Sequence, residues 1–296
     1  MASFHGVFAN LLTAFTPDGE AFDAAAQRDY VQWVISENVH GVSVSLSSGE
    51  FGFQTGEERA AVIECVARAV NGRVPVVAGV SELSLHATCE LARRAADFGV
   101  SALMVMPRSY IVLSEAEVLN YYAALLRAVQ IPVGIYNNPS ATGIDISAAL
   151  YERIVALDPQ RITLSKEGSG HLARTPDVLA RCPGFSMLQG HARLMLEALQ
   201  QGASGTDFAL ASLLPRQFLA VYDEAVVHRN MEKARAAHDR LLPLFGLMQK
   251  YQVTRLAKAM APMLGLKLGP HRAPLLPLPE ADRSAIERVV RGLATA

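Results

Sequence analysis

Lys166 is the residue whose type and position best fit catalysis, because it ends a short apolar run at residues 161–166 (RITLSK). Side chains alternate between the faces of a β-strand, so Ile162, Leu164 and Lys166 are expected to share one side. Burial disfavours the charged amine, and a neutral amine attacks carbonyls. We therefore predict a Schiff-base lysine with a lowered pKa. The alternative is an ordinary strand-end lysine in a salt bridge at the rim.

Tyr136 ends an earlier apolar run, residues 131–136 (IPVGIY), and is followed by a turn sequence at residues 137–139 (NNP). Two neighbouring parallel strands would bring this phenol and the Lys166 amine to the same rim of a sheet. A phenol in that place could move protons between the lysine, the carbinolamine and a ketone substrate. The alternative is a core tyrosine whose hydroxyl has an internal partner.

A third group of polar residues, Ser47, Ser48, Gly49 and Glu50, follows the apolar run at residues 41–46. Two hydroxyls and successive backbone N–H groups between a strand and a helix could hold a carboxylate. The same residue types are also ordinary turn formers. Neither serine belongs to a Gly-x-Ser-x-Gly sequence, so a hydrolase nucleophile is not expected.

The elements that would position these residues are strand-sized apolar runs that alternate with helical patterns. The runs lie near residues 7–15, 41–46, 74–78, 102–106, 133–136, 162–166, 185–189 and 203–208. Eight strand-helix units predict an α/β protein, a (β/α)8 TIM barrel over residues 1–224. Residues 225–296 are expected to form a helical extension packed on the barrel. Catalytic groups on such barrels lie at the C-terminal ends of the strands, where all three candidates fall.

Composition limits the classes of function. The chain has 296 residues, 51% of them hydrophobic, and 27 basic against 28 acidic residues give a net charge of −1. Without a basic block, neither nucleic acid nor an anionic membrane surface is an expected partner. No apolar stretch approaches the roughly 18 residues of a membrane span, and the N-terminus lacks a secretory pattern. Three widely spaced cysteines fit free thiols, so a soluble cytoplasmic protein is expected.

Two cofactor-binding patterns are incomplete in this sequence. Residues 168–173 (GSGHLA) form a loose dinucleotide-binding pattern after a strand, but such a site needs an acid about 20 residues later. The chain has Leu188, Gln189 and Gly190 there. The eight histidines are scattered without the spacing of metal ligands, so neither a cofactor nor a metal is expected. A nicotinamide-dependent oxidoreductase would still be recognised by tight NADH binding without imine formation.

Taken together, these residues resemble the dihydrodipicolinate synthase and N-acetylneuraminate lyase family of pyruvate-dependent class I aldolases. The matching segments are LSSGE at 46–50, AGV at 78–80, MP at 106–107, YNNPSATG at 136–143, SKE at 165–167 and GASG at 202–205. The resemblance implies that Lys166 is the Schiff-base lysine and Tyr136 the proton-relay tyrosine. It also implies that Ser47 and Ser48 bind the carboxylate of a 2-keto acid and that Ser47 joins the relay.

The resemblance extends to assembly. Tyr110 is matched, one position late, to a family tyrosine that reaches into the relay of a neighbouring subunit. Members of the family are commonly dimers of dimers, so a homotetramer is expected.

The remaining substrate contacts are assigned to Gly49, Ala141, Gly190 and Phe208.

Three departures from the family pattern concern the substrate. Ala141 stands where the synthases carry an arginine that holds a substrate carboxylate, Leu46 replaces a glycine, and Gln54 replaces a leucine. We therefore predict a Schiff-base-forming lyase, an aldolase or dehydratase, acting on pyruvate or a 2-keto-3-deoxy sugar acid. The alternatives are a dihydrodipicolinate synthase with altered carboxylate binding and a homologue that binds 2-keto acids without turning them over.

Overall fold

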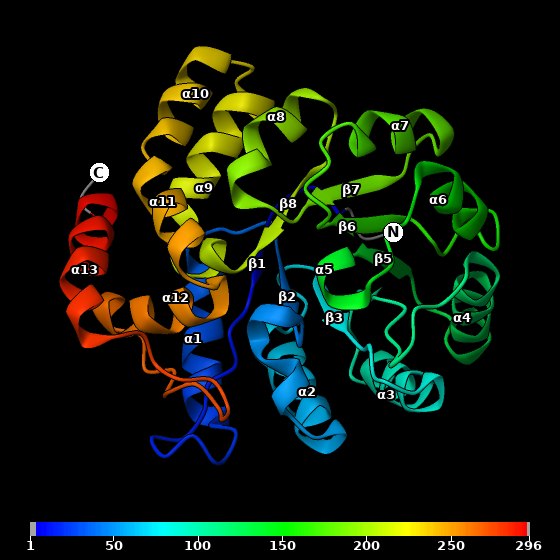
Figure 1. Ribbon diagram of the computed structural model, residues 1–296, viewed down its shortest axis with the longest axis horizontal. Helices are drawn as coiled ribbons and strands as arrows, with labels where there is room; N and C mark the ends of the chain where they lie inside the picture. The colour runs from blue at the N-terminus through cyan, green and yellow to red at the C-terminus, as the bar shows by residue number, and fades with distance from the viewer. Residues whose placement is uncertain (1–3, 295–296) are drawn as a thin grey trace.

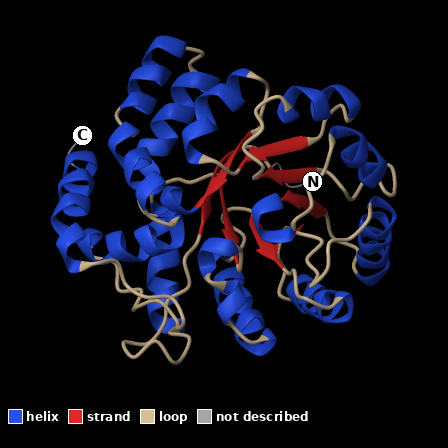
Figure 2. Ribbon diagram, in the orientation of Figure 1, coloured by secondary structure: helices blue, strands red, loops and turns tan. Residues whose placement is uncertain are grey.

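Eight parallel strands close into one barrel in the computed structural model, which describes residues 4–294 (Figures 1 and 2). The strands are β1 (Gly6–Asn10), β2 (Gly41–Val44), β3 (Val76–Gly79), β4 (Ala102–Val105), β5 (Val133–Asn137), β6 (Leu164–Glu167), β7 (Ser186–Gln189) and β8 (Gly205–Phe208). Each pairs with its neighbours in the sequence, and β8 closes the barrel on β1. The predicted TIM barrel is confirmed.

Helices cover the outside of the barrel (Figure 2). They are α1 (Ala24–Ser36), α2 (Gly56–Val70), α3 (Leu85–Asp97), α4 (Glu115–Ala128), α5 (Pro139–Thr142), α6 (Ala148–Val155), α7 (Arg174–Arg181), α8 (Met195–Gln200) and α9 (Pro215–Tyr222). Two of them begin with reciprocal capping boxes, Thr55 with Glu58 and Ser114 with Glu117, which satisfy backbone N–H groups that the first helical turn leaves unpaired. These caps fix where each helix starts after the loop that precedes it.

Short turns of other helix types occupy several loops. They are η1 (Ser47–Gly49), η2 (Phe51–Phe53), η3 (Ala192–Leu194), η4 (Ala209–Ser212), η6 (Ala261–Leu264) and the π-helical turn η5 (Asp223–Val227). Three of them, η1, η3 and η4, follow directly or closely on strands, at the end of the barrel where βα-loops gather.

Two apolar layers follow from the alternation of side chains along the strands. The inner one fills the barrel and includes Phe8, Val77, Met104, Leu164 and Leu188. The larger outer layer lies between the strands and the helices. Ile162 belongs to the outer layer, so its predicted place beside Leu164 is wrong. The reason is that β6 begins only at Leu164, and strand alternation does not apply before it.

The C-terminal segment forms α10 (Met231–Asp239), α11 (Leu242–Lys250), α12 (Val253–Met260) and α13 (Glu280–Ala294). In Figure 1 these helices gather on one side of the barrel, next to α1 and α9. The amide of Gln217 in α9 donates to the Leu293 carbonyl of α13 at 2.7 Å. Further along, Arg272 donates to the Glu20 carbonyl at 2.6 Å and forms an ion pair with Glu58 at 2.8 Å. The C-terminal segment is therefore held against α9, α2 and the loop after β1.

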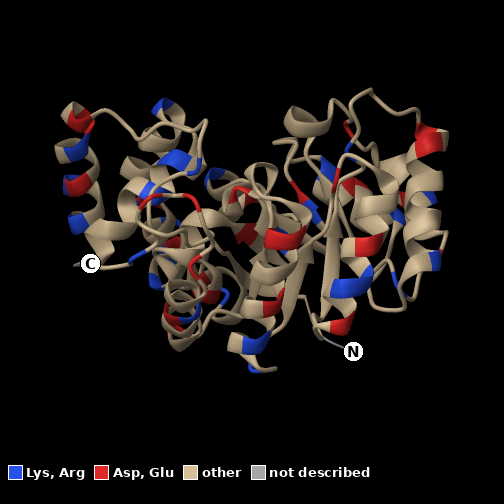
Figure 3. Ribbon diagram, turned by 90° about the horizontal axis from the view of Figure 1, so that it is seen from below, with Lys and Arg blue, Asp and Glu red and all other residues tan. Residues whose placement is uncertain are grey.

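Charged residues of both signs are mixed along the helices, without a block of either sign (Figure 3). This agrees with the balance of 27 basic and 28 acidic residues. Within residues 4–294, none of the helices combines the length and the apolar character that crossing a membrane requires.

Candidate active site

Lys166 lies in the interior of the barrel, on the C-terminal half of β6. Lys166 is only 3% exposed, and the alternation of side chains along β6 places it on the same face as Leu164. In register, Lys166 is paired with Tyr136 of β5 on one side and Leu188 of β7 on the other. The structure thus brings the predicted amine and phenol together. Lys166 Nζ is 4.9 Å from the centre of the Tyr136 ring, which is itself 6% exposed.

A buried carboxylate that sequence reasoning missed contacts this amine. Asp207 of β8 is fully buried, and its Oδ1 lies 3.1 Å from Lys166 Nζ. The same oxygen accepts a hydrogen bond of 2.8 Å from the hydroxyl of Ser43 in β2. Among the described residues, no donor pairs with the other carboxylate oxygen, Oδ2. The site therefore holds an ion pair in the barrel interior rather than an isolated amine.

This ion pair reverses the predicted direction of the lysine's pKa. Burial lowers the pKa of Lys166, but the attraction of the Asp207 carboxylate and the effect of the Tyr136 hydroxyl raise it more. The net result is a pKa above that of an ordinary lysine, so the expectation of a lowered value is wrong. Lys166 is therefore an ammonium in the resting site, and a base must remove a proton before it can act as a nucleophile.

The loop after β5 holds the hydroxyl of Tyr136. Asn138 Nδ2 donates to this oxygen at 3.2 Å, and Ser140 Oγ donates to Asn138 Oδ1 at 2.8 Å. Pro139 begins α5 and removes one N–H group that a helix start leaves unpaired. The turn sequence thus fixes both the end of the strand and the environment of the phenol.

Glu167 faces away from the lysine, as strand alternation predicts. It is 1% exposed and accepts hydrogen bonds from Asn137 Nδ2 at 3.2 and 3.3 Å, the Tyr151 hydroxyl at 3.3 Å and the Ser169 N–H at 2.6 Å. Its carboxylate is therefore satisfied by groups from β5, α6 and the loop after β6. It ties the two strands together outside the barrel interior.

Ser47 and Ser48 lie in η1, immediately after β2. Ser48 is 6% exposed, while Ser47 is partly exposed. The N–H of Gly49 bonds to the Leu46 carbonyl at 2.9 Å, and the carbonyl of Gly49 accepts from Gln54 Nε2 at 2.7 Å. Gly49 is thus occupied within the turn, and Gln54 holds the turn in place. The two hydroxyls are left as the side-chain groups of this loop that could meet a ligand.

Three other predicted contacts are scattered. Ala141 is exposed in α5, and Tyr110 is 97% exposed in the loop before α4, beside the exposed Ile111 and Val112. Gly190 lies at the end of β7, where its N–H donates to the Glu167 carbonyl at 2.7 Å. Within residues 4–294, the side chains that contact the Lys166 amine are Asp207 and Tyr136, and neither Tyr110 nor Gly190 is among them.

Phe208 requires a correction. Its ring belongs to the outer apolar layer and packs edge-on against Phe218 of α9, with ring centres 4.7 Å apart. Because side chains alternate along β8, the neighbouring Asp207 takes the inward position. An acid two residues beyond the inward Gly205 was the signal that could have identified Asp207 from the sequence.

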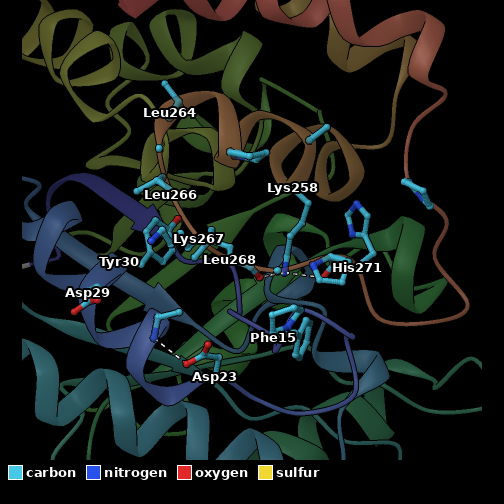
Figure 4. Close-up of a pocket in the computed structure, with 18 of the residues that line it drawn as sticks. Phe15, Asp23, Asp29, Tyr30, Lys258, Leu264, Leu266, Lys267, Leu268 and His271 are labelled. Atoms are coloured by element: carbon cyan, nitrogen blue, oxygen red, sulfur yellow. Dashed lines mark hydrogen bonds between the residues drawn. The ribbon is translucent and has the colours of Figure 1, made fainter.

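A separate cavity of about 1230 Å³ lies between α1, α12 and residues 264–271 (Figure 4). Lys258 borders it and donates to the carbonyls of Thr13, Leu268 and Pro270 at 2.8, 2.8 and 3.1 Å. Burial lowers the pKa of Lys258 to about 8, although Glu50 opposes this effect. The lining of the cavity includes neither Lys166 nor Tyr136, and the three carbonyls engage this lysine structurally.

No group of three or more His, Cys, Asp and Glu residues within 4–294 has an arrangement that could hold a metal ion. The side chains described for this site supply an amine, a phenol, a carboxylate and hydroxyls. Their arrangement fits proton transfer at a nitrogen that can bond to a carbonyl carbon.

Comparison with known proteins identifies the family of this chain. A model of the "Dihydrodipicolinate synthetase family" matches residues 3–293. A 4-hydroxy-tetrahydrodipicolinate synthase of Sorangium cellulosum is 35% identical over 97% of this chain and 95% of that protein. An uncharacterized DapA-like lyase of Pyrobaculum islandicum is 31% identical over 97% of this chain and 98% of its own.

Solved structures share the architecture. A putative dihydrodipicolinate synthetase from Pseudomonas aeruginosa superposes with a TM-score of 0.94 at 32% identity, covering 98% of this chain and all of that one (100%). A second structure, from Agrobacterium tumefaciens and described as a dihydrodipicolinate synthase, has a TM-score of 0.91 at 27% identity and covers 98% of both chains. The similarity includes the barrel and the C-terminal helices.

Proposed function

This chain belongs to the dihydrodipicolinate synthetase family, and we propose that it is a lyase in which Lys166 forms a Schiff base with a 2-keto acid. The observation that supports this most directly is the placement of Lys166. Its amine is buried at the C-terminal half of β6, beside the ring of Tyr136, where a barrel of this kind carries its chemistry.

A side chain of the site is available for each step of the proposed reaction. Once deprotonated, Lys166 Nζ attacks the keto carbon of the substrate, and loss of water from the carbinolamine gives an imine. Tyr136 lies close enough to exchange protons with the carbinolamine oxygen, and Ser47 extends the relay toward solvent. The protonated imine withdraws electrons from the neighbouring carbon. Either a carbon–carbon bond cleaves or water leaves from a 2-keto-3-deoxy acid.

The turn at the end of β2 is proposed to hold the substrate's carboxylate. Ser48 is 6% exposed there, and Ser47 lies next to it. Hydrogen bonds to a carboxylate are roughly twice as strong as neutral ones, so two hydroxyls suffice to orient a small keto acid. Gly49 supports this turn through its own backbone bonds, and Gly190, a further proposed substrate contact, allows the end of β7 to approach the Glu167 backbone closely.

The far end of the substrate is proposed to be a hydroxylated chain. Ala141 provides a methyl group where a guanidinium would be needed to grip a second carboxylate, and such a pair is strong and directional. An aldolase or dehydratase for a sugar acid is therefore favoured. A synthase with altered carboxylate binding is the second candidate, supported by the 35% identical relative of that name.

Assembly into a homotetramer is also proposed. Tyr110, Ile111 and Val112 are 97%, 63% and 66% exposed in one chain, which leaves three large apolar side chains on a single loop in water. A contact with a second copy would bury them and could carry the Tyr110 phenol toward that copy's site. The cytoplasm remains the expected compartment.

The proposed function is tested by hydrogen exchange on pyruvate. With the proposed mechanism, pyruvate should exchange its C3 hydrogens for deuterium in heavy water, as followed by proton NMR, because the imine acidifies that position. Lys166→Ala should abolish the exchange. Exchange that persists at the parent rate in Lys166→Ala would contradict the proposal. A panel of 2-keto-3-deoxy acids and of aldehydes offered with pyruvate then separates dehydratase, aldolase and synthase activities.

A further inference from the structure

The Asp207 carboxylate occupies a place that the proposed mechanism has not used. Its Oδ1 lies 3.1 Å from Lys166 Nζ, with side-chain exposures of 0% for the acid and 4% for the lysine. The hydroxyl of Ser43 in β2 donates to the same oxygen at 2.8 Å and helps to fix its position. Within residues 4–294 the second oxygen, Oδ2, is buried without a hydrogen-bond partner.

Because of its surroundings, the contact with Asp207 is the main electrostatic interaction of the Lys166 amine. In the part of the chain that the structure describes, the titratable groups that act on Lys166 are Asp207 of β8 and Tyr136 of β5. The inward neighbours in β6 and β7, Leu164 and Leu188, are apolar. Charges that are both removed from water interact much more strongly than they would at the surface.

We propose that Asp207 is a further catalytic residue of this site, resting on the proposed function of Lys166. Its carboxylate takes a proton from the Lys166 ammonium to free the amine, and it then remains beside the nitrogen as the counter-ion of the protonated imine. Because it touches the reacting nitrogen itself, its role is direct.

The steps balance. One proton passes from the ammonium to Asp207, and the nitrogen lone pair bonds to the keto carbon while the carbonyl π electrons move to oxygen. That oxygen takes one proton from the nitrogen, passed on by the Tyr136 hydroxyl, and a second from Asp207, and leaves as water. The nitrogen keeps its last proton as the iminium. Overall, an ammonium and a ketone become an iminium and water, with one positive charge before and after, and Asp207 ends as the carboxylate.

This charge conservation explains why a buried acid suits a Schiff-base site. An iminium in an apolar interior would tend to lose its proton, and a neutral imine is a weak electron sink. The carboxylate that neutralises the resting ammonium also neutralises the iminium. A purely structural ion pair would instead hold the lysine as an ammonium and oppose its reaction.

The first test uses the unaltered protein. The pair Lys166–Asp207 shares one proton, so the fraction with a free amine is set inside the site and not by bulk pH. The rate of pyruvate trapping by cyanoborohydride, measured at subsaturating pyruvate, should therefore change little between about pH 6 and 8. A rate that climbs about tenfold for each pH unit, as the free fraction of an independent lysine does, would overturn the proposal.

The second test removes the charge. Asp207→Asn keeps the size of the side chain and Asp207→Ser leaves room for a water molecule; circular dichroism shows which variant folds. Without the carboxylate, burial lowers the pKa of the lysine and only the Tyr136 hydroxyl opposes it. The midpoint of the trapping rate against pH, which lies above about pH 8 in the parent, should move to lower pH by at least about one unit. Pyruvate C3 exchange at pH 7 should fall roughly 100-fold, because the imine loses its counter-ion.

The control is Glu167→Gln. It removes a buried carboxylate one residue from Lys166 that faces the other side of β6, so the pH midpoint of trapping should stay where the parent has it. If the parent traps pyruvate at Lys166 while the Asp207 variants keep the parent's midpoint and exchange rate, the role of Asp207 is refuted and the proposed function stands. If the parent fails to trap pyruvate at Lys166, the proposed function fails, and this inference fails with it.

Discussion

Tyr136 and Lys166 are register partners on the neighbouring strands β5 and β6, and Lys166 Nζ lies 4.9 Å from the centre of the Tyr136 ring. Both side chains are nearly excluded from water. A phenol and an amine held in this way are fixed partners in a dry interior, an arrangement that suits proton transfer. The two strands set that distance, and no long loop is involved.

Tyr136→Phe should separate binding from proton transfer. The ring and its packing remain, but the hydroxyl that accepts from Asn138 is lost. Borohydride trapping of pyruvate on Lys166 should still occur, while steady-state turnover should fall by roughly 10²- to 10⁴-fold, the usual contribution of general acid–base catalysis. Turnover at the parent rate would show that this phenol does not carry the proton.

Ser48→Ala should weaken substrate binding more than chemistry. The hydroxyl of Ser48 is proposed to donate to the substrate carboxylate, and a hydrogen bond to a charged group contributes about 1.5–3 kcal/mol. The KM for pyruvate should therefore rise by roughly 10- to 100-fold, with trapping at saturating pyruvate preserved. An unchanged KM together with a lower kcat would instead place Ser48 in the proton relay.

Gly190→Ala tests the backbone packing at the end of β7 through its effect on the stability of the protein. A Cβ at Gly190 would lie 2.8 Å from the Glu167 carbonyl oxygen, which is backbone and cannot move aside cheaply. We expect the free energy of unfolding in urea to fall by about 1–3 kcal/mol. The matched control is Gly246→Ala in α11, where a Cβ meets nothing within 4 Å. That substitution should stabilise the helix by roughly 0.5–1 kcal/mol, and equal effects at both sites would contradict this account.

The fold was predictable because its signals are local. Strand-sized runs, helical patterns between them and the parallel connections they demand specify a closed barrel without any long-range information. The same alternation placed Lys166 inward and Glu167 outward, and the structure agrees. At Ile162 the rule was applied before the strand begins, and there it failed.

The charge state of the site was not predictable from these patterns. Asp207 stands 41 positions after Lys166, and the two meet only because β6 and β8 both point side chains into the barrel. Sequence reasoning chose the neighbouring Phe208, whose ring packs outward on Phe218. Without the carboxylate, burial was the single effect considered, and the direction of the lysine's pKa was therefore wrong.

Lys258 should give stability an opposite pH dependence to that of an ordinary lysine. Burial holds its pKa at about 8, below its usual value of 10.5, so between these values the unfolded chain binds more protons than the folded one. In this window the contribution of Lys258 to stability rises with pH. Urea unfolding at about pH 7.5 and about pH 9.5 should show a larger gain for the parent than for Lys258→Met, and the same change in both would contradict the assignment.

The two buried lysines also supply the most direct test of the central claim. The protein is incubated with pyruvate and borohydride and digested, and the reduced adduct is located by mass spectrometry. The account predicts the adduct on Lys166 and none on Lys258, whose donors are engaged by three carbonyls although its pKa is the lower of the two. An adduct on Lys258, or no adduct on Lys166, would contradict it.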